Sequence, residues 1–167
     1  MPAGSVTYLI GEEANLKNLQ EQGNGKGSIQ IGGGIDLSGN ALEAILPLKA
    51  KDEQSEAKAL DLFATTLSCD AAVLNGTEVK KIDDQMRNAM RPVATLAYAL
   101  RYAGARHNVI SLWQSGNNQN QEMTDFYKAQ LSGVSPVAAL RKAQLSQISR
   151  NVYPADWASL QIFGPMY

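Results

Sequence analysis

Short apolar runs and longer amphipathic segments alternate along this chain. Each short run is bounded by glycine or by polar residues, which is typical of strands that are buried in a sheet. The run at 62–67 is mostly apolar, as expected of a strand covered on both faces of a parallel sheet. By these signals the sequence predicts strands at 6–10, 28–31, 41–48, 62–67, 109–113 and 157–163.

Helices are predicted where apolar residues recur at steps of three and four positions. Segment 82–103 carries such a stripe, and Pro92 is expected to kink or restart the helix. Ser135-Pro136 is a favourable N-cap and first-turn pair for a helix that continues to about residue 149. Two further helices are predicted over 12–20 and 123–131.

This alternation of strands and helices predicts a single domain over residues 1–167, of the α/β class. A mostly parallel sheet with helices on both faces is the expected architecture. In such sheets, ligands and chemistry lie beyond the carboxyl ends of the strands. That rule selects the polar residues that directly follow predicted strands, at 32–36, 68–71 and 114–120.

Composition then narrows the possible functions. The chain has 167 residues, with 15 Lys and Arg against 16 Asp and Glu, one Cys and one His. One Cys and one His are too few for the four nitrogen or sulfur ligands of a structural zinc site, so no metal and no cofactor is expected. Nucleic acid is not an expected partner either, because phosphate binding favours a basic excess.

Neither a membrane span nor a secretory signal is evident. No stretch approaches the roughly 20 apolar residues that a membrane helix needs, so no membrane insertion is expected. The first residues lack the basic and apolar segments of a secretory signal. Together with the free thiol, this favours a cytoplasmic protein.

Several motifs occur in a recognisable order. They include Leu-Ser-Cys-Asp at 67–70, Tyr-Ala-Gly-Ala-Arg followed by Ser-Leu-Trp at 102–113, and Gly-Val-Ser-Pro followed by Ala-Leu-Arg-Lys-Ala-Gln within 126–147. A closing Tyr-Pro-Ala-Asp-Trp-Ala begins at residue 153. These segments resemble the C-terminal, caspase-like half of a CHAT domain, a relative of caspases and separase. Residues 98–164 are the most specific part of the resemblance.

The resemblance implies a caspase-like three-layer sandwich and, in the family's usual form, a cysteine peptidase with a His–Cys dyad. The His follows one parallel strand in the pattern His-Ile-Ala-x-His-Gly, and the Cys follows the next in Ser-Ala-Cys-Glu. Here Cys69 falls at the nucleophile position. Gly34, within Gln-Ile-Gly-Gly-Gly-Ile at 30–35, falls where the catalytic His is expected.

The resemblance also implies a substrate cleft around these positions. After the tryptophan that corresponds to Trp113, the family commonly has Val-Asp-Asp, and such acids help bind a basic substrate side chain. Neither acid is present here, so the cleft is interpreted as vestigial. Its inferred residues are Ser68, Asp70 and Gly33 together with Gln114, Asn117 and Asn118.

The one imidazole of the chain does not replace the missing base. A cysteine peptidase needs an imidazole within hydrogen-bond reach of the thiol and of the leaving amine. His107 precedes the predicted strand at 109–113, whereas catalysis is expected after that strand, and six residues put roughly 20 Å between those points. His107 is therefore interpreted as structural. Cys69 is interpreted either as a nucleophile, with Asp70 shaping the pocket, or as a small residue packed at the end of a buried strand.

The leading hypothesis is a catalytically inactive, caspase-like domain that binds protein or forms part of a larger assembly. A full CHAT domain typically has a further N-terminal half, so surface normally covered by that half is expected to meet a protein partner or a second copy. Two alternatives stay open. One is an active cysteine peptidase using Cys69 with an unrecognised or partner-supplied base, and the other is a small-molecule sensor using the cleft near Gly34 and Cys69.

Overall fold

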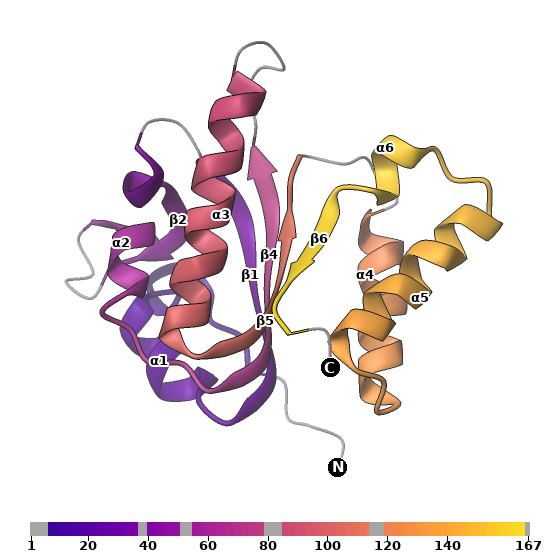
Figure 1. Ribbon diagram of the computed structural model, residues 1–167. Helices are drawn as coiled ribbons and strands as arrows, with labels where there is room; N and C mark the ends of the chain where they lie inside the picture. The colour runs from indigo at the N-terminus through magenta and orange to yellow at the C-terminus, as the bar shows by residue number, and fades with distance from the viewer. Residues whose placement is uncertain (1–6, 37–39, 51–54, 79–84, 114–118, 166–167) are drawn as a thin grey trace.

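A single mixed sheet forms the centre of the molecule. The computed structural model describes residues 7–36, 40–50, 55–78, 85–113 and 119–165. Among these residues, six strands form the sheet in the order β3-β2-β1-β4-β5-β6 (Figure 1). The strands are β1 (Lys26–Asp36), β2 (Ile45–Lys49), β3 (Glu56–Lys58), β4 (Cys69–Glu78), β5 (Ala105–Ser111) and β6 (Leu160–Phe163).

The middle of this sheet is parallel, as the sequence predicted. β4 pairs in the parallel direction with β1 on one side and with β5 on the other. β2 and β6 join the outer sides of this trio in the antiparallel direction, and β3 is added antiparallel outside β2. The carboxyl ends of β1, β4 and β5 therefore lie along one edge of the sheet, the carboxyl edge, and their amino ends lie along the opposite, amino edge.

Helices cover both faces of the sheet, which gives the three layers that were expected (Figure 1). Residues from the first group of helices pack in one hydrophobic cluster, and residues from α4 and α5 pack in another. The first group is α1 (Leu16–Gly23), α2 (Ala59–Leu62) and α3 (Gln85–Ala103). The second group is α4 (Gln119–Leu131), α5 (Pro136–Ser149) and α6 (Pro154–Trp157).

Strand β4 contributes to both clusters. Leu74 packs in the larger cluster with Leu96 of α3, and Val73 packs in the smaller cluster with Phe126 of α4; all four are fully buried. Successive residues of a strand point to opposite faces of the sheet. β4 is therefore covered on both faces, which explains its nearly continuous apolar segment.

Local signals place several helix ends. The Ser135 hydroxyl oxygen accepts a hydrogen bond from the Ala138 N–H at 3.5 Å, and Pro136 opens α5, as predicted. Pro92 was expected to kink or restart the helix, and α3 does not restart there but runs through it as one helix. Gly104, with a φ of 115°, follows the last residue of this helix and fits the expected stop.

The prediction of a strand at 62–67 is wrong. Residue 62 is the last residue of α2, and the chain leaves this helix through a turn in which the Thr65 hydroxyl donates a hydrogen bond to the Asp61 carbonyl at 2.8 Å. At the start of the same helix, the Asp61 carboxylate accepts a hydrogen bond from the Lys58 N–H at 2.8 Å. The strand begins instead at Cys69 and continues through Asn75-Gly76, although an Asn-Gly pair is typical of a turn. Pairing with β1 and β5 on both sides overrides that local preference.

Three other predicted strands also differ from the structure. Residues 7–10, the described part of the first predicted strand, do not lie in a strand. Ala41–Glu43 forms a 3-10 turn, in which the Asn40 side chain accepts from the Leu42 N–H at 3.3 Å, and only the following residues form β2. In the last predicted strand, residue 157 still belongs to α6, which Pro154 opens.

Candidate functional site

β1 and β4 end side by side at the carboxyl edge. Gly32 of β1 pairs with Asn75 of β4, and Ile35 pairs with Thr77. The register of the two strands shifts between these pairs. Gly34 lies within the shift and is exposed to solvent. In the family, each dyad residue follows a parallel strand, so the resemblance places both residues at this edge.

The backbones of β1 and β4 approach each other closely at this shift. Gly76 has a φ of 109°, and a Cβ added to it would collide with the Gly33 carbonyl oxygen. Gly33 has a φ of 137°, and a Cβ there would lie 2.7 Å from Cβ of Pro47. Both positions thus need glycine, because other residues rarely adopt such φ values and no space exists for a side chain.

Cys69 lies at the opposite edge of the sheet. It is the first residue of β4, where it pairs with Lys26 of β1 and Ala105 of β5. From Lys26 to Gly34, β1 advances eight residues, which is about 26 Å at 3.3 Å per residue. The expectation that Cys69 follows a strand and shares one cleft with Gly34 is therefore wrong. A small-molecule cleft formed by both residues does not fit this geometry either.

The residues next to Cys69 line an open hollow at the amino edge. The hollow has a volume of about 260 Å³. Within it, the Arg106 guanidinium forms an ion pair with the Asp70 carboxylate at 3.6 Å. Three residues predicted for the cleft, Ser68, Cys69 and Asp70, meet here, whereas Gly33 and Gly34 do not. The lining residues are Gly25, Lys26, Gly27, Ser68, Cys69, Asp70, Gly104 and Arg106.

The Cys69 thiol is protonated at neutral pH. Burial raises its pKa to about 11, and the neighbouring Asp70 carboxylate adds to the rise. Only 8% of the residue is exposed. Because the thiolate is the reactive form of cysteine, these surroundings oppose nucleophilic chemistry at Cys69.

His107 is held between two backbone carbonyls. The prediction that it precedes the strand is wrong, because β5 begins at Ala105 and His107 lies within it as the register partner of Ala71, where it is buried. Its Nδ1 faces the Asp70 carbonyl oxygen at 3.1 Å, and its Nε2 faces the Pro165 carbonyl oxygen at 3.0 Å. Both ring nitrogens are occupied, and the ring connects the segment after β6 to β4. This arrangement supports the structural interpretation of His107.

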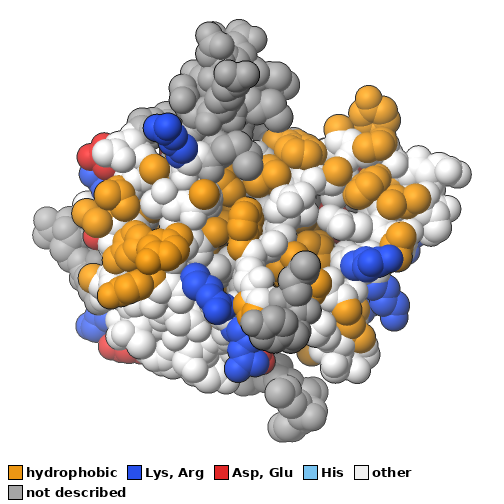
Figure 2. All heavy atoms as spheres, in the orientation of Figure 1, with side chains coloured by type: hydrophobic (Ala, Val, Ile, Leu, Met, Phe, Trp, Pro, Cys, Tyr) orange, Lys and Arg blue, Asp and Glu red, His pale blue; other side chains and the backbone are white. Residues whose placement is uncertain are grey.

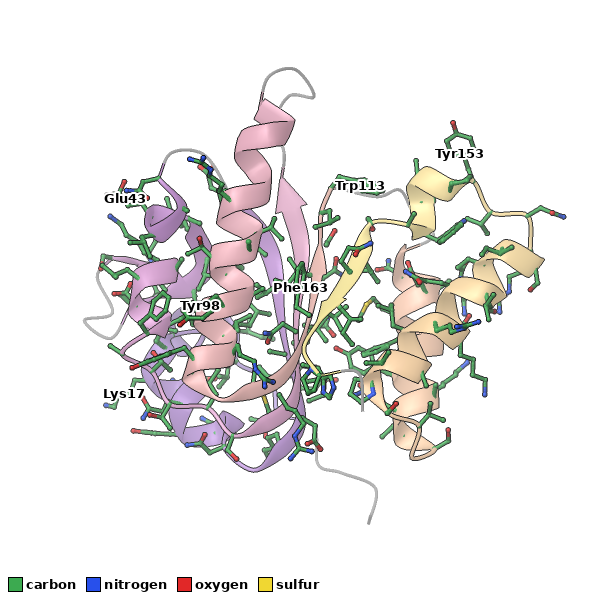
Figure 3. All side chains as sticks on the ribbon, in the orientation of Figure 1. Lys17, Glu43, Tyr98, Trp113, Tyr153 and Phe163 are labelled. Carbon is green, nitrogen blue, oxygen red and sulfur yellow. The ribbon has the colours of Figure 1, made fainter. Side chains whose placement is uncertain are left out.

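The predicted cleft residues Gln114, Asn117 and Asn118 lie outside the described residues. The chain is described up to Trp113, which is labelled in Figure 3. The Trp113 indole N–H donates a hydrogen bond to the Ala155 carbonyl at 2.8 Å. This bond ties the end of β5 to α6, so the start of the predicted cleft loop is anchored to the second helical layer.

Sequence reasoning missed a buried carboxyl group at Glu122 in the first turn of α4. Glu122 is 0% exposed, and neither of its carboxyl oxygens has a hydrogen-bond partner among the described residues. Burial raises its pKa to about 8, and the nearby Gln144 side chain offsets part of the rise. The Gln144 amide nitrogen itself donates to the Leu160 carbonyl at 3.1 Å. The sequence did contain a signal for this burial: Glu122 lies four positions before the apolar Phe126, so the two residues share one face of the helix.

The described residues offer no metal site. No group of three or more His, Cys, Asp or Glu residues within them lies close enough together to hold a metal ion. Nor does any described helix combine the length and the apolar character needed to cross a lipid bilayer. Both findings concern only the part of the chain that the structure describes.

Comparison with models of protein families gives a match. The family model of the CHAT domain matches residues 2–165, which is nearly the whole chain. The search of curated proteins found no match. The matched range includes residues 98–164, the part that carries the most specific motifs.

Proposed function

Because the chain belongs to the CHAT domain family, we propose that it is a peptidase-related domain without hydrolytic activity that acts by binding protein. The observation that carries this proposal is the pairing of Ile35 with Thr77 at the carboxyl edge. In the family's usual form the dyad residues follow adjacent parallel strands at this edge. Here, that place has Gly34 and Thr77, whereas the only thiol of the chain begins β4 at the amino edge.

The end of β4 gives a better alignment of the family's nucleophile motif. Residues 75–78 read Asn-Gly-Thr-Glu, and Ser-Ala-Cys-Glu aligns with them so that both glutamates coincide. The cysteine of the motif then corresponds to Thr77. We prefer this alignment to the one on Cys69 because it puts the motif at the end of a parallel strand, where the resemblance requires it.

Neither aligned position supplies what peptide hydrolysis needs. Gly34 has no side chain to accept a proton, and a threonine hydroxyl is a weak nucleophile without an adjacent base. Elsewhere, Cys69 is kept protonated by burial, and both ring nitrogens of His107 face carbonyl oxygens. These facts support a scaffold that has kept the family's fold and lost its chemistry.

An exposed aromatic cluster supports the binding of protein. Phe63 contacts Tyr98 and Tyr102 of α3, with ring centroids 5.8 and 5.5 Å apart. The two tyrosines are 64% and 65% exposed, and Leu60 of α2 is 54% exposed. Figure 2 shows a continuous apolar area over α2 and α3, and Tyr98 is labelled in Figure 3. Exposed apolar areas rich in tyrosine are typical of protein interfaces.

The absence of hydrolysis is tested by mapping new peptide termini. The purified chain and its Cys69→Ala and Thr77→Ala variants are each incubated with a complex protein mixture, and new termini are identified by mass spectrometry. We expect no termini above those of the buffer control. Cleavage by the chain that either substitution abolishes would identify a working nucleophile and refute the proposal.

The binding role is tested through the aromatic cluster. A photo-crosslinking residue is placed at Tyr98 and, as a matched control, at Leu131, which is 84% exposed at the end of α4. We expect a recurrent protein adduct from position 98 that is absent from position 131. We also expect Tyr102→Ala to reduce this adduct. A chain that stays monomeric and crosslinks equally from both positions would contradict the proposal.

A further inference from the structure

Helix α5 is apolar on two sides. On its inner side, Ala139, Leu140 and Ala143 are buried in the smaller hydrophobic cluster. On its outer side, Leu145 is 52% exposed and Ile148 is 47% exposed. The outer side of a surface helix normally carries charged and polar residues. On α5, these two apolar residues lie on that side and are open to solvent.

Three apolar residues of the outer side lie along one line of the helix, and Arg141 lies on the same line. Arg141 follows Val137 by four positions, Leu145 follows Arg141 by four, and Ile148 follows Leu145 by three. Residues at these spacings are neighbours on one helix face. We call these four residues the α5 stripe. It extends over about 16 Å of helix, which is long enough to contact three turns of another helix.

The charges at the α5 stripe are basic. Arg141 lies within the stripe and Lys142 beside it; both are exposed, and neither has an ion-pair partner among the described residues. On the neighbouring helix α4, Glu122 is buried and Asp125 is paired with Arg150 at 3.3 Å. On the face that Figure 2 shows, basic and apolar side chains lie together over α5, with no acidic side chain among them.

We infer that the α5 stripe is the docking site for an amphipathic helix of a partner protein, with acidic residues beside its apolar positions. Apolar residues three and four positions apart would pack against Leu145 and Ile148 as in other helix pairs. Carboxylates beside them would meet Arg141 and Lys142, which now lack partners.

Two other occupants fit the α5 stripe less well. A second copy of the chain, paired through a two-fold axis, would bring the basic residues of both stripes into one interface, where they repel. A lipid surface would favour aromatic anchors and a larger number of cations than the stripe supplies. The α5 stripe lies on the opposite face of the sheet from the aromatic cluster, so this inference does not depend on the proposed function.

The test uses two synthetic helical peptides of about five turns with identical leucine positions. One peptide has glutamate beside the leucines, and its twin has lysine at the same places. Fluorescence anisotropy measures their binding to the full chain at low and at high salt. We expect the acidic peptide to bind at least about tenfold more tightly than the twin, and we expect salt to reduce the difference.

Variants locate the binding. Leu145→Asp is expected to abolish the binding of the acidic peptide, whereas Leu131→Asp, at a more exposed apolar residue outside the stripe, is expected to leave it unchanged. The double variant Arg141→Glu, Lys142→Glu is expected to reverse the preference in favour of the basic twin. That reversal is a gain of binding, so it cannot arise from misfolding.

Three outcomes would overturn the inference. The first is equal binding of the two peptides to the unmodified chain. The second is a stronger interaction with anionic lipid vesicles than with the acidic peptide, lost in Leu145→Asp, which would identify a lipid surface. The third is a concentration-dependent dimer that Leu145→Asp disperses, which would identify a second copy as the occupant.

Discussion

Ile35 and Thr77 are paired across β1 and β4 at the carboxyl edge, directly after Gly34 in β1. This pairing brings together the two positions that correspond to the family's dyad in the proposed alignment. It also separates both from Cys69, which pairs with Lys26 at the beginning of the same two strands. The first prediction rests on this separation.

Restoring the dyad requires substitutions at positions 34 and 77, and not at Cys69. In a Cys69→Ala background, we expect Thr77→Cys with Gly34→His to be alkylated by iodoacetamide at pH 7 about tenfold faster than Thr77→Cys alone. The reason is that a neighbouring imidazole lowers the pKa of a thiol. Alkylation is followed by mass spectrometry, and equal rates in the two variants would count against the alignment.

Gly34→His alone is expected to yield no peptide hydrolysis, because Thr77 lacks the nucleophilicity of a thiolate and the family's loop acids are absent. A fluorogenic peptide with a basic residue before the cleaved bond measures this. Robust hydrolysis by the single variant would show that the rest of the site is intact and that the interpretation of the cleft as vestigial is wrong.

The unmodified Cys69 is expected to react slowly with iodoacetamide below pH 9, with a rate that rises toward pH 11. Burial raises the pKa of this thiol from 9.0 to about 11, so the folded state favours the neutral form. The stabilisation this gives is present below pH 9 and is lost as the pH approaches 11. Alkylation of the urea-unfolded chain, which should react at the ordinary thiol pKa, is the control.

Glu122→Gln is expected to stabilise the protein above neutral pH. Burial raises the pKa of this carboxyl from 4.5 to about 8, so between these values the unfolded chain loses a proton that the folded chain keeps. Stability contributed by the neutral carboxyl is full below pH 4.5 and is lost as the pH rises through 8, at up to about 1.4 kcal/mol per pH unit. The amide does not ionise, so the variant lacks this slope.

Urea unfolding at pH 4.5, 6.5 and 8.5 measures the effect of Glu122→Gln. The difference in unfolding free energy between the variant and the unmodified chain should grow with pH in favour of the variant. Glu21→Gln, at an exposed position of α1, is the matched charge-neutralising control. A difference that is constant with pH would show that Glu122 ionises alike in the folded and unfolded states.

Gly76→Ala is expected to destabilise the protein by about 2–4 kcal/mol, because a Cβ there meets the Gly33 carbonyl and the φ of 109° is strained for alanine. Gly27→Ala is the matched control in β1, since no atom lies within 4 Å of its added Cβ. Equilibrium urea unfolding compares the two variants. Similar stabilities would show that β1 and β4 move apart at little cost.

Much of the fold follows from local signals in the sequence. Ser135-Pro136 starts α5, and the apolar stripe of 82–103 gives α3, because capping and helical spacing depend on nearby residues. β4 was misplaced for the opposite reason. Its limits are set by pairing with β1 and β5, which lie far away in the sequence, so the apolar residues at 62–67 and the Asn-Gly pair were misleading.

In the candidate site, too, nearby residues predicted some features, whereas others depend on pairing between distant strands. The local pattern predicted a strand at 28–31 and the resemblance placed Gly34 just after it, whereas β1 extends to Asp36 and includes Gly34. Cys69 was placed beside it because residues 67–70 resemble the family's nucleophile segment and because a strand was expected at 62–67. Thr77 carried no chemical signal of its own, since threonine is common in strands. Only the register of β1 and β4 shows that Thr77 lies beside the position that follows Gly34.

The close approach of β1 and β4 at Gly33 and Gly76 also bears on how this chain can evolve. In the proposed alignment the family has alanine where this chain has Gly76, and that methyl group no longer fits beside the neighbouring strand. Alanine at position 76 would therefore destabilise the present fold, whereas substitutions at 34 and 77 do not meet this contact. The tight spacing of the two strands thus limits which residues of the family's motif the chain can accept at this edge.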